Sequence, residues 1–309
     1  MITTITLNTA IDKAYVVKDF AKDSVTRVQT CTNTAGGKGL NVSKVIKLCG
    51  EDIIATGFVG GHAGAYVEDL LKEHAILTDF VHTQSETRSC INILASDGTS
   101  TEFLEPGAPV TSDEVNQLVQ KLNDLINKSD VITISGSVPK GVENTFYAHL
   151  VTTIKEKGKQ VILDTSGELL KNGIKACPTL IKPNSEELEA LLGISIHNQE
   201  EVIEAAKKLH ETGIEYVVVS LGGDGALLIC KEGVFHGKPP KITPVNTVGC
   251  GDSMVGAFAV SLARKLPIEE ALRYSVAVSA ANALTMATGS FELNDMRKLL
   301  PDVIVNHLS

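Results

Sequence analysis

Short apolar runs rich in β-branched residues alternate with amphipathic segments along most of the chain. The apolar runs predict strands at Ile2–Leu7, Ile53–Val59, Val131–Ser135, Val161–Asp164, Leu180–Lys182 and Tyr216–Leu221. Helical periodicity fills segments between them, including Glu114–Asn127, Thr145–Lys157 and Glu200–Glu211. This alternation is typical of a mostly parallel sheet covered by helices, so we predict an α/β fold. Ligands of such sheets bind beyond the carboxyl ends of the strands.

Two segments interrupt the alternation and predict a small additional sheet. Tyr15–Thr34 and Arg88–Glu105 are extended, contain no long helical pattern and include a hairpin signal at Ser96–Thr99. We interpret them as a small antiparallel lid, formed by about 13–34 and 86–106, and an ordinary edge hairpin is the alternative.

The last part of the chain, after Gly251, is predicted to be entirely helical. Helices are expected at Asp252–Lys265, Ile268–Ala287 and Leu293–Leu299. No internal repeat, low-complexity segment or linker divides the chain, so we expect a single folded unit spanning 1–309.

Composition and charge exclude several classes of protein. Apolar residues make up 43% and charged residues 21%, which is ordinary for a soluble globular protein. The formal net charge of −9 argues against nucleic-acid binding, which usually requires a basic face. No run approaches a membrane span, and the N-terminus reads as a strand rather than a signal peptide. The six cysteines lack Cys-x-x-Cys spacing, so we expect neither a zinc site nor disulfides, and a cytoplasmic location.

The segment Thr247–Ser253 combines two glycines with an acid at the start of a predicted helix. Gly249 and Gly251 permit tight backbone geometry, and the N–H groups of a helix start can bind an anion. Asp252 beside that anion hole is suited to accept a proton from an attacking hydroxyl. The alternative is that Asp252 and Ser253 only cap a buried helix.

A glycine-rich loop at Thr34–Asn41 has some features of a P-loop but does not satisfy its pattern. Gly39 follows Lys38 where a P-loop needs Ser or Thr, and Thr32 stands where the upstream glycine is needed. No glycine cluster fits the dinucleotide fingerprint, which argues against a nicotinamide-dependent oxidoreductase. The loop opens a predicted helix at Asn41–Leu48, so its backbone can approach a polyhydroxyl ligand. A plain strand-to-helix turn is the alternative.

Isolated polar residues follow predicted strands or lie on the lid segments. Asp12 follows the first strand, where a carboxylate can accept hydrogen bonds from two sugar hydroxyls, although such an Asp often caps a turn. Arg27 and Arg88 lie on the lid segments and suit phosphate oxygens, although a lone surface arginine is usually solvated. Ser137 lies just beyond a buried strand, where ligands collect.

Two further segments are candidates for a nucleotide and metal site. Lys182–Glu187 follows a strand and begins a helix, so Asn184 and Glu187 fit a capping box. The functional alternative makes them holders of Mg²⁺, partly through water. Ser220–Ala226 lies between two apolar strands and is either a hairpin turn or a place where backbone approaches a nucleotide phosphate.

Taken in order, these motifs match a known kinase family. The chain resembles the phosphofructokinase-B branch of the ribokinase-like sugar kinases in Leu7–Asp12, Gly-Gly-Lys-Gly-x-Asn from Gly36, Ser-Gly-Ser-x-Pro from Ser135, Lys-Pro-Asn-x-x-Glu from Lys182 and Gly-x-Gly-Asp-Ser from Gly249. The resemblance implies a three-layer α/β/α core with a mostly parallel sheet and a small β-sheet lid. It also implies transfer of phosphate from ATP, with Mg²⁺, to a hydroxyl of a sugar phosphate.

The resemblance further implies a role for each matching residue. Asp252 is the implied base, and the backbone of Gly249, Cys250 and Gly251 is the implied anion hole, with Cys250 replacing the usual alanine. The implied ligands of the sugar and its phosphates are Asp12, Arg27, Gly36, Gly37, Lys38, Asn41, Arg88 and Ser137. The implied nucleotide ligands are Lys182, Asn184, Ser220, Gly222, Gly225 and Asn282, with Glu187 organising Mg²⁺.

The identity of the sugar rests on a narrower similarity. Thr34–Asn41, Glu86–Ile91 and Thr101–Gly107 are most similar to tagatose-6-phosphate kinases, so tagatose 6-phosphate is the expected acceptor. Fructose 1-phosphate, the substrate of the similar 1-phosphofructokinases, is the alternative. A non-catalytic sugar-phosphate sensor is an alternative of another class, which the intact Asp252 argues against. The small sheet is a dimer interface in many members of the family, so the resemblance implies that this protein can form a homodimer through the same sheet.

Overall fold

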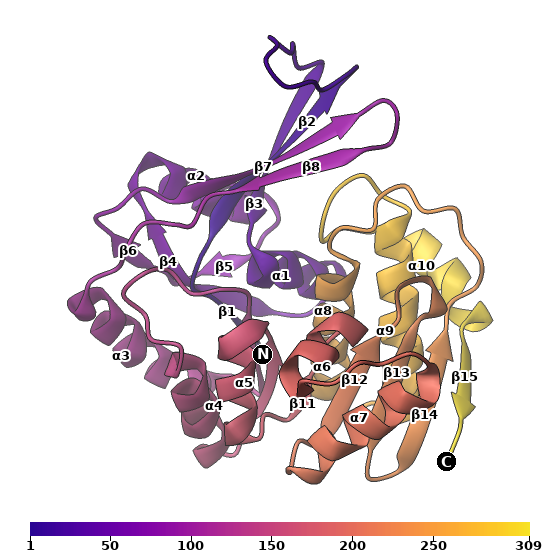
Figure 1. Ribbon diagram of the computed structural model, residues 1–309. Helices are drawn as coiled ribbons and strands as arrows, with labels where there is room; N and C mark the ends of the chain where they lie inside the picture. Colours follow the sequence, from indigo (N-terminus) through magenta and orange to yellow (C-terminus); the bar gives the residue numbers. More distant parts are fainter.

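A large mixed sheet forms the centre of the protein in the computed structural model, which describes all residues 1–309 (Figure 1). Its strands are β1 (Ile2–Thr6), β4 (Ile53–Gly60), β5 (Leu77–Thr78), β6 (Val81–Thr83), β9 (Val131–Ser135), β10 (Gln160–Asp164), β11 (Leu180–Ile181), β12 (Tyr216–Ser220), β13 (Ala226–Cys230), β14 (Gly233–Lys238) and β15 (Ile304–His307). Their order is β15-β14-β13-β12-β11-β10-β9-β1-β4-β5, with β6 beside β4. The pairings from β5 to β12 are parallel, and those from β12 to β15 are antiparallel.

All the predicted strands form, and their ends lie within one residue of the expected positions. Strand β1 shows why an apolar run predicts them well, because Ile2 and Ile5 are fully buried on opposite faces. Its polar side chains are also buried and bond inside the protein: Thr3 to Ser129 and Thr4 to Ser43, both at 2.6 Å.

Helices cover both faces of the sheet and give the expected three-layer α/β/α core. One face is covered by α1 (Lys38–Leu48), α2 (Gly61–Glu73), α8 (Cys250–Ala263), α9 (Ile268–Ala283) and α10 (Leu293–Leu299). The other face is covered by α3 (Ser112–Lys128), α4 (Phe146–Glu156), α5 (Gly167–Gly173), α6 (Ser185–Leu192) and α7 (Gln199–Glu211). Each face has its own cluster of buried apolar side chains, as two layers of helices require.

A second sheet of four strands stands away from the core at the top of Figure 1. It contains β2 (Ala10–Val17), β3 (Thr30–Gly36), β7 (Arg88–Ala95) and β8 (Ser100–Leu104) in the order β3-β2-β7-β8. The predicted hairpin joins β7 to β8, with Gly98 at φ +86° in its turn. The antiparallel expectation is wrong for the central pair, because β2 and β7 both leave the core in the same direction and pair in parallel.

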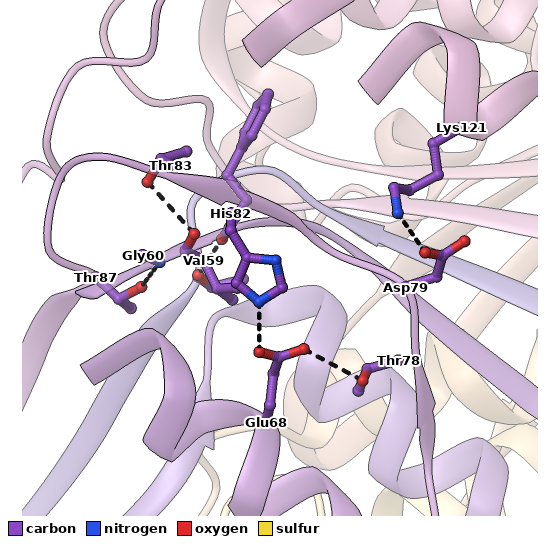
Figure 2. A network of polar contacts seen from close by, with 11 residues as sticks. Val59, Gly60, Glu68, Thr78, Asp79, His82, Thr83, Thr87 and Lys121 are labelled. Carbon is purple, nitrogen blue, oxygen red and sulfur yellow. Dashed lines mark hydrogen bonds and ion pairs between the residues drawn. The ribbon is translucent and has the colours of Figure 1, made fainter. Parts of the chain in front are cut away.

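Polar contacts fasten the residues before β7 to the edge of the main sheet and to α2 (Figure 2). Thr87 Oγ1 accepts a hydrogen bond from the Gly60 N–H at 2.9 Å. Next to it, His82 Nε2 lies 2.8 Å from Glu68 Oε2 on α2. The start of β7 therefore has a fixed position relative to the core.

The C-terminal region corrects the expectation that everything after Gly251 is helical. Residues of β15 pair antiparallel with β14, and the His307 ring stacks on Phe235 at 4.6 Å. Helix α9 ends at Ala283 rather than Ala287. Beyond its end, the Thr285 hydroxyl lies within hydrogen-bonding distance of the carbonyls of Asn282, Ala287 and Ser290, and the chain forms a loop there. That loop reaches the candidate site described next.

Candidate active site

A cavity of about 650 Å³ opens between the small sheet and the carboxyl ends of the parallel strands. The predicted residues that line it come from both sides: Asp12, Gly37, Lys38, Asn41, Arg88, Lys182, Asn184, Glu187, Ser220, Gly249, Gly251 and Asp252. The structure therefore brings together side chains separated by most of the length of the chain. Cavity residues that sequence reasoning did not single out include Asn92, Glu102, Asn246, Met286 and Thr288.

Asp252 lies in the first turn of α8, on the wall of this cavity, and is 7% exposed. Its Oδ2 accepts a hydrogen bond from Asn41 Nδ2 at 2.8 Å. Burial raises the pKa of Asp252 to about 6, against the opposing attraction of Lys38. A carboxylate with a pKa near neutrality is well matched to accepting and releasing a proton.

The backbone before Asp252 has the tight geometry that the two glycines predict. Gly249 has φ +82°, and a Cβ there would lie 2.6 Å from Thr288 Cγ2. A Cβ on Gly251 would lie 3.2 Å from Lys182 Nζ. The Cys250 and Ser253 N–H groups bond to the carbonyls of Thr247 and Gly249, so Gly251 and Asp252 supply the free N–H groups of the helix start. Free N–H groups beside a lysine form a site suited to an anion.

Asp164 at the end of β10 was missed by sequence reasoning and organises the two cavity lysines. Its carboxylate is 2% exposed and lies 3.4 Å from Lys38 Nζ and 3.5 Å from Lys182 Nζ. Burial works against the charge, but Lys182 and Lys38 together hold the pKa of Asp164 below its usual range. The signal that would have found it is an acid at the carboxyl end of a buried parallel strand.

The side of the cavity next to the small sheet holds Asp12 and Arg88. A Cβ on Gly36 would lie 2.1 Å from Asp12 Cγ, so only glycine leaves room for this carboxylate. Burial raises the pKa of Asp12, and Lys44 and Arg88 oppose the shift. Arg88 donates to the carbonyls of Glu105 at 2.6 Å and Asn8 at 3.1 Å, so part of its hydrogen-bonding capacity is already used by the backbone.

A smaller polar pocket of about 240 Å³ adjoins the main cavity at Gly37, Lys38 and Arg88. Ser137 lies in this pocket and accepts a hydrogen bond from Asn8 Nδ2 at 3.0 Å. Its lining is largely hydroxyl groups with two cationic side chains, a composition suited to a phosphate.

Some of the residues predicted to bind the nucleotide line the cavity, and others lie outside it. Asn184 and Glu187 form the expected capping box, with Glu187 Oε2 accepting from the Asn184 N–H at 3.0 Å. Gly222 and Gly225 do not line either cavity. They shape the turn after β12, where a Cβ on Gly225 would lie 1.9 Å from the Gly237 carbonyl.

Three other predicted residues lie away from the cavity surface. Arg27 is exposed on the loop between β2 and β3. Asn282 is fully buried, donates to Val248 O at 3.1 Å and accepts from the Ser290 N–H, so its side chain does not line the cavity. Its amide joins the start of α8 to the loop after α9. Cys250 Sγ lies 3.4 Å from Asn282 Nδ2, so the thiol faces α9.

Comparison with known protein families identifies the family of this chain. The profile of "pfkB family carbohydrate kinase" matches residues 5–294. The chain belongs to the pfkB family of carbohydrate kinases. It is an ATP-dependent sugar kinase, and the predicted ribokinase-like fold is confirmed.

Individual relatives cover nearly the whole chain. It is 36% identical over 308 residues to "1-phosphofructokinase" of Bacillus subtilis, covering 100% of both chains. It is 38% identical over 310 residues to "Tagatose-6-phosphate kinase" of Staphylococcus epidermidis, covering 99% of both. The solved structure of phosphofructokinase-2 from Escherichia coli in complex with potassium has a TM-score of 0.92 at 30% identity, covering 97% of this chain and 98% of that one. None of the helices in this kinase is both long enough and apolar enough to cross a membrane.

Proposed function

We propose that this kinase transfers the terminal phosphoryl group of ATP to a hydroxyl of a ketohexose monophosphate, with tagatose 6-phosphate as the favoured acceptor. The observation that carries the proposal is Asp252, a cavity carboxylate that lies against the helix start and contacts Asn41 on the sugar side. A relative named tagatose-6-phosphate kinase at 38% identity supports the choice of sugar. The product of this reaction is tagatose 1,6-bisphosphate.

The proposed chemistry is an in-line displacement at the terminal phosphorus of ATP. Asp12 and Asn41 hold sugar hydroxyls, and Asp252 accepts the proton of the attacking hydroxyl as its oxygen bonds to phosphorus. The bond to the β-phosphate oxygen breaks, and ADP leaves. The free N–H groups of Gly251 and Asp252 and the Lys182 ammonium stabilise the charge on the transferred group.

The small polar pocket is the proposed site of the phosphate that the sugar already carries. Lys38 and Arg88 provide positive charge there, and Ser137 provides a hydroxyl. Lys38 borders both cavities, so it also reaches toward the transferred group. Arg27 is exposed on the loop between β2 and β3. Its contact with a substrate phosphate and a homodimer through the small sheet are further parts of this proposal.

The residues around Glu187 fit a Mg²⁺ ion that arrives with the nucleotide. No group of three or more acidic, histidine or cysteine side chains forms a metal cage in the protein. Mg²⁺ usually retains waters and binds through one or two carboxylates together with phosphates, so a single cavity carboxylate is sufficient. Glu187 would hold the ion, which neutralises phosphate charge when bound, and Asn184 fixes the Glu187 carboxylate.

Fructose 1-phosphate is the second candidate acceptor, because a relative of similar identity is named 1-phosphofructokinase. Both sugars carry a phosphate at one end and the accepting hydroxyl at the other. Kinetic efficiency on tagatose 6-phosphate, fructose 1-phosphate and fructose 6-phosphate, followed by ADP release, distinguishes them. A higher value for tagatose 6-phosphate supports the proposal. Release of no ADP with any of the three would contradict a ketohexose monophosphate as the acceptor.

A further inference from the structure

Lys44 is a buried lysine that the proposed chemistry does not use. It lies on α1, is 5% exposed and does not line the cavity. Its Nζ donates to the Thr288 carbonyl at 3.0 Å and has no carboxylate in direct ion-pair contact. Burial lowers the pKa of Lys44 to about 8, while Asp12 and Asp252 attract the charge. Burying an ammonium without a carboxylate partner costs folding free energy, so we looked for a functional role of Lys44.

The carbonyl that Lys44 holds belongs to the loop 284–290, which lies between the two sides of the site. A Cβ on Gly289 would lie 2.7 Å from Asn41 Cβ, so the loop packs directly on the residue that contacts Asp252. A Cβ on Gly249 would lie 2.6 Å from Thr288 Cγ2, so the loop also packs on the helix start. A displacement of Thr288 would therefore move both the anion hole and the surroundings of the base.

Lys44 also lies within electrostatic range of the carboxylates on the sugar side of the cavity. The charged groups that act on its ammonium are Asp12 from β2 and Asp252 from α8, and the loop contributes only a carbonyl. Among the groups that favour the ionised form of Asp12, Lys44 has the largest effect. Charges at such buried positions are only weakly screened by solvent.

We propose that Lys44 is a positioning residue for phosphoryl transfer, which holds the Thr288 carbonyl in place and faces Asp12 with a positive charge. The proposal rests on the proposed function. It links sugar binding to the geometry of the anion hole through one buried side chain.

The test compares Lys44→Met with Lys44→Arg and with the control Lys47→Met, which removes a partly exposed lysine from the same helix. We expect Lys44→Met to lose about 100-fold in kcat/KM, the usual scale for misplacing a site by an ångström. Its melting temperature should stay the same or rise, because a buried unpaired ammonium is removed. Lys44→Arg should recover most of the activity, and Lys47→Met should behave like the parent enzyme.

The pH dependence of the sugar KM provides a readout that a purely structural role would not change. Without Lys44 the pKa of Asp12 rises further, so a larger fraction of this carboxyl becomes protonated as pH falls than in the parent enzyme. In Lys44→Met the sugar KM should therefore rise more steeply as pH falls from 8 to 6 than it does in Lys44→Arg, while the KM for ATP stays level. Lys44→Arg keeps its charge throughout this range and should show only a small change. In the parent enzyme Lys44, with a pKa of about 8, gains positive charge as pH falls and should likewise prevent the rise in KM.

Two results would overturn the proposal. One is a Lys44→Met enzyme with kcat/KM within about twofold of the parent. The other is a Lys44→Met enzyme that loses activity and melting temperature together. In that case the ratio of its sugar KM to that of the parent enzyme would be the same at pH 6 and at pH 8. A parent enzyme inactive on all three ketohexose phosphates would instead contradict the proposed function, so the two failures are distinguishable.

Discussion

Asn41 Nδ2 donates a hydrogen bond to Asp252 Oδ2 at 2.8 Å, although 211 positions separate the two residues in the chain. The contact joins the first turn of α1 to the first turn of α8. It places the proposed base beside a residue proposed to hold the sugar. The predictions below test this arrangement and the groups that support it.

Replacing the proposed base should separate binding from chemistry. We expect Asp252→Asn to lower kcat by about 100-fold or more, because general-base catalysis typically contributes that much. The sugar KM should change little, since the amide has nearly the same shape. Steady-state kinetics with the preferred ketohexose phosphate measures both values. Near-normal turnover would remove Asp252 from the mechanism.

The same substitution should make the protein more stable at neutral pH. A folded pKa of about 6 lies above the ordinary aspartate pKa of 3.8, so the native state binds this proton more tightly than the unfolded state. Stability from this group therefore falls as pH rises from about 4 to 6, and it stays low above that range. Asp252→Asn removes the buried charge and should raise stability at pH 7 by about 3 kcal/mol. Thermal melts at pH 4 and pH 7 measure this, and an equal effect at both would contradict it.

The Asn41 contact should set the acidic limb of the activity profile. The hydrogen bond from Asn41 favours the ionised form of Asp252 and lowers its pKa. In Asn41→Ala the midpoint of the acidic limb of kcat/KM should therefore move above the parent value of about 6. Activity is lost as pH falls through this midpoint, because Asp252 becomes protonated. An unchanged midpoint would show that another group controls the limb.

Asp164 should be important for both stability and activity. Asp164→Asn leaves the buried Lys182 and the exposed Lys38 without their shared counter-charge. We expect a loss of about 3 kcal/mol in the free energy of unfolding and a lower kcat/KM. Glu168→Gln is the matched control, because its pair with Lys171 is exposed and should contribute little. Equal effects of the two substitutions in denaturant titrations would argue against this role.

Gly249 should tolerate no side chain. Gly249→Ala places a methyl group at φ +82° and within 2.6 Å of Thr288. Gly158→Ala is the control, because it has φ +68° and open space around it, so it bears only the backbone strain of about 1 kcal/mol. We expect Gly249→Ala to lose at least 1 kcal/mol more and most of its activity. Chemical denaturation and the ADP-release assay measure the two effects.

Much of the fold could be predicted from local pattern. Strands such as Val131–Ser135 formed where expected, because a buried parallel strand must be apolar along its whole length. Strand β15 was not predicted, since its apolar run is limited to Val303–Val305, the strand is largely exposed and it pairs only with β14. Pairing of that kind depends on distant residues, which no local pattern describes.

The sequence by itself determined the order of the motifs, the helix start at Asp252 and the glycines that this start requires, because these depend on local backbone geometry. Only the tertiary structure decided which side chains meet there. Asp164 forms ion pairs with two lysines, and Asn282 is buried and hydrogen-bonded to Val248 instead of lining the cavity. Gly225 lies in the turn after β12, against the Gly237 carbonyl. The physical reason is that charge pairing, burial and steric exclusion act between residues far apart in the chain, and folding alone brings them within range.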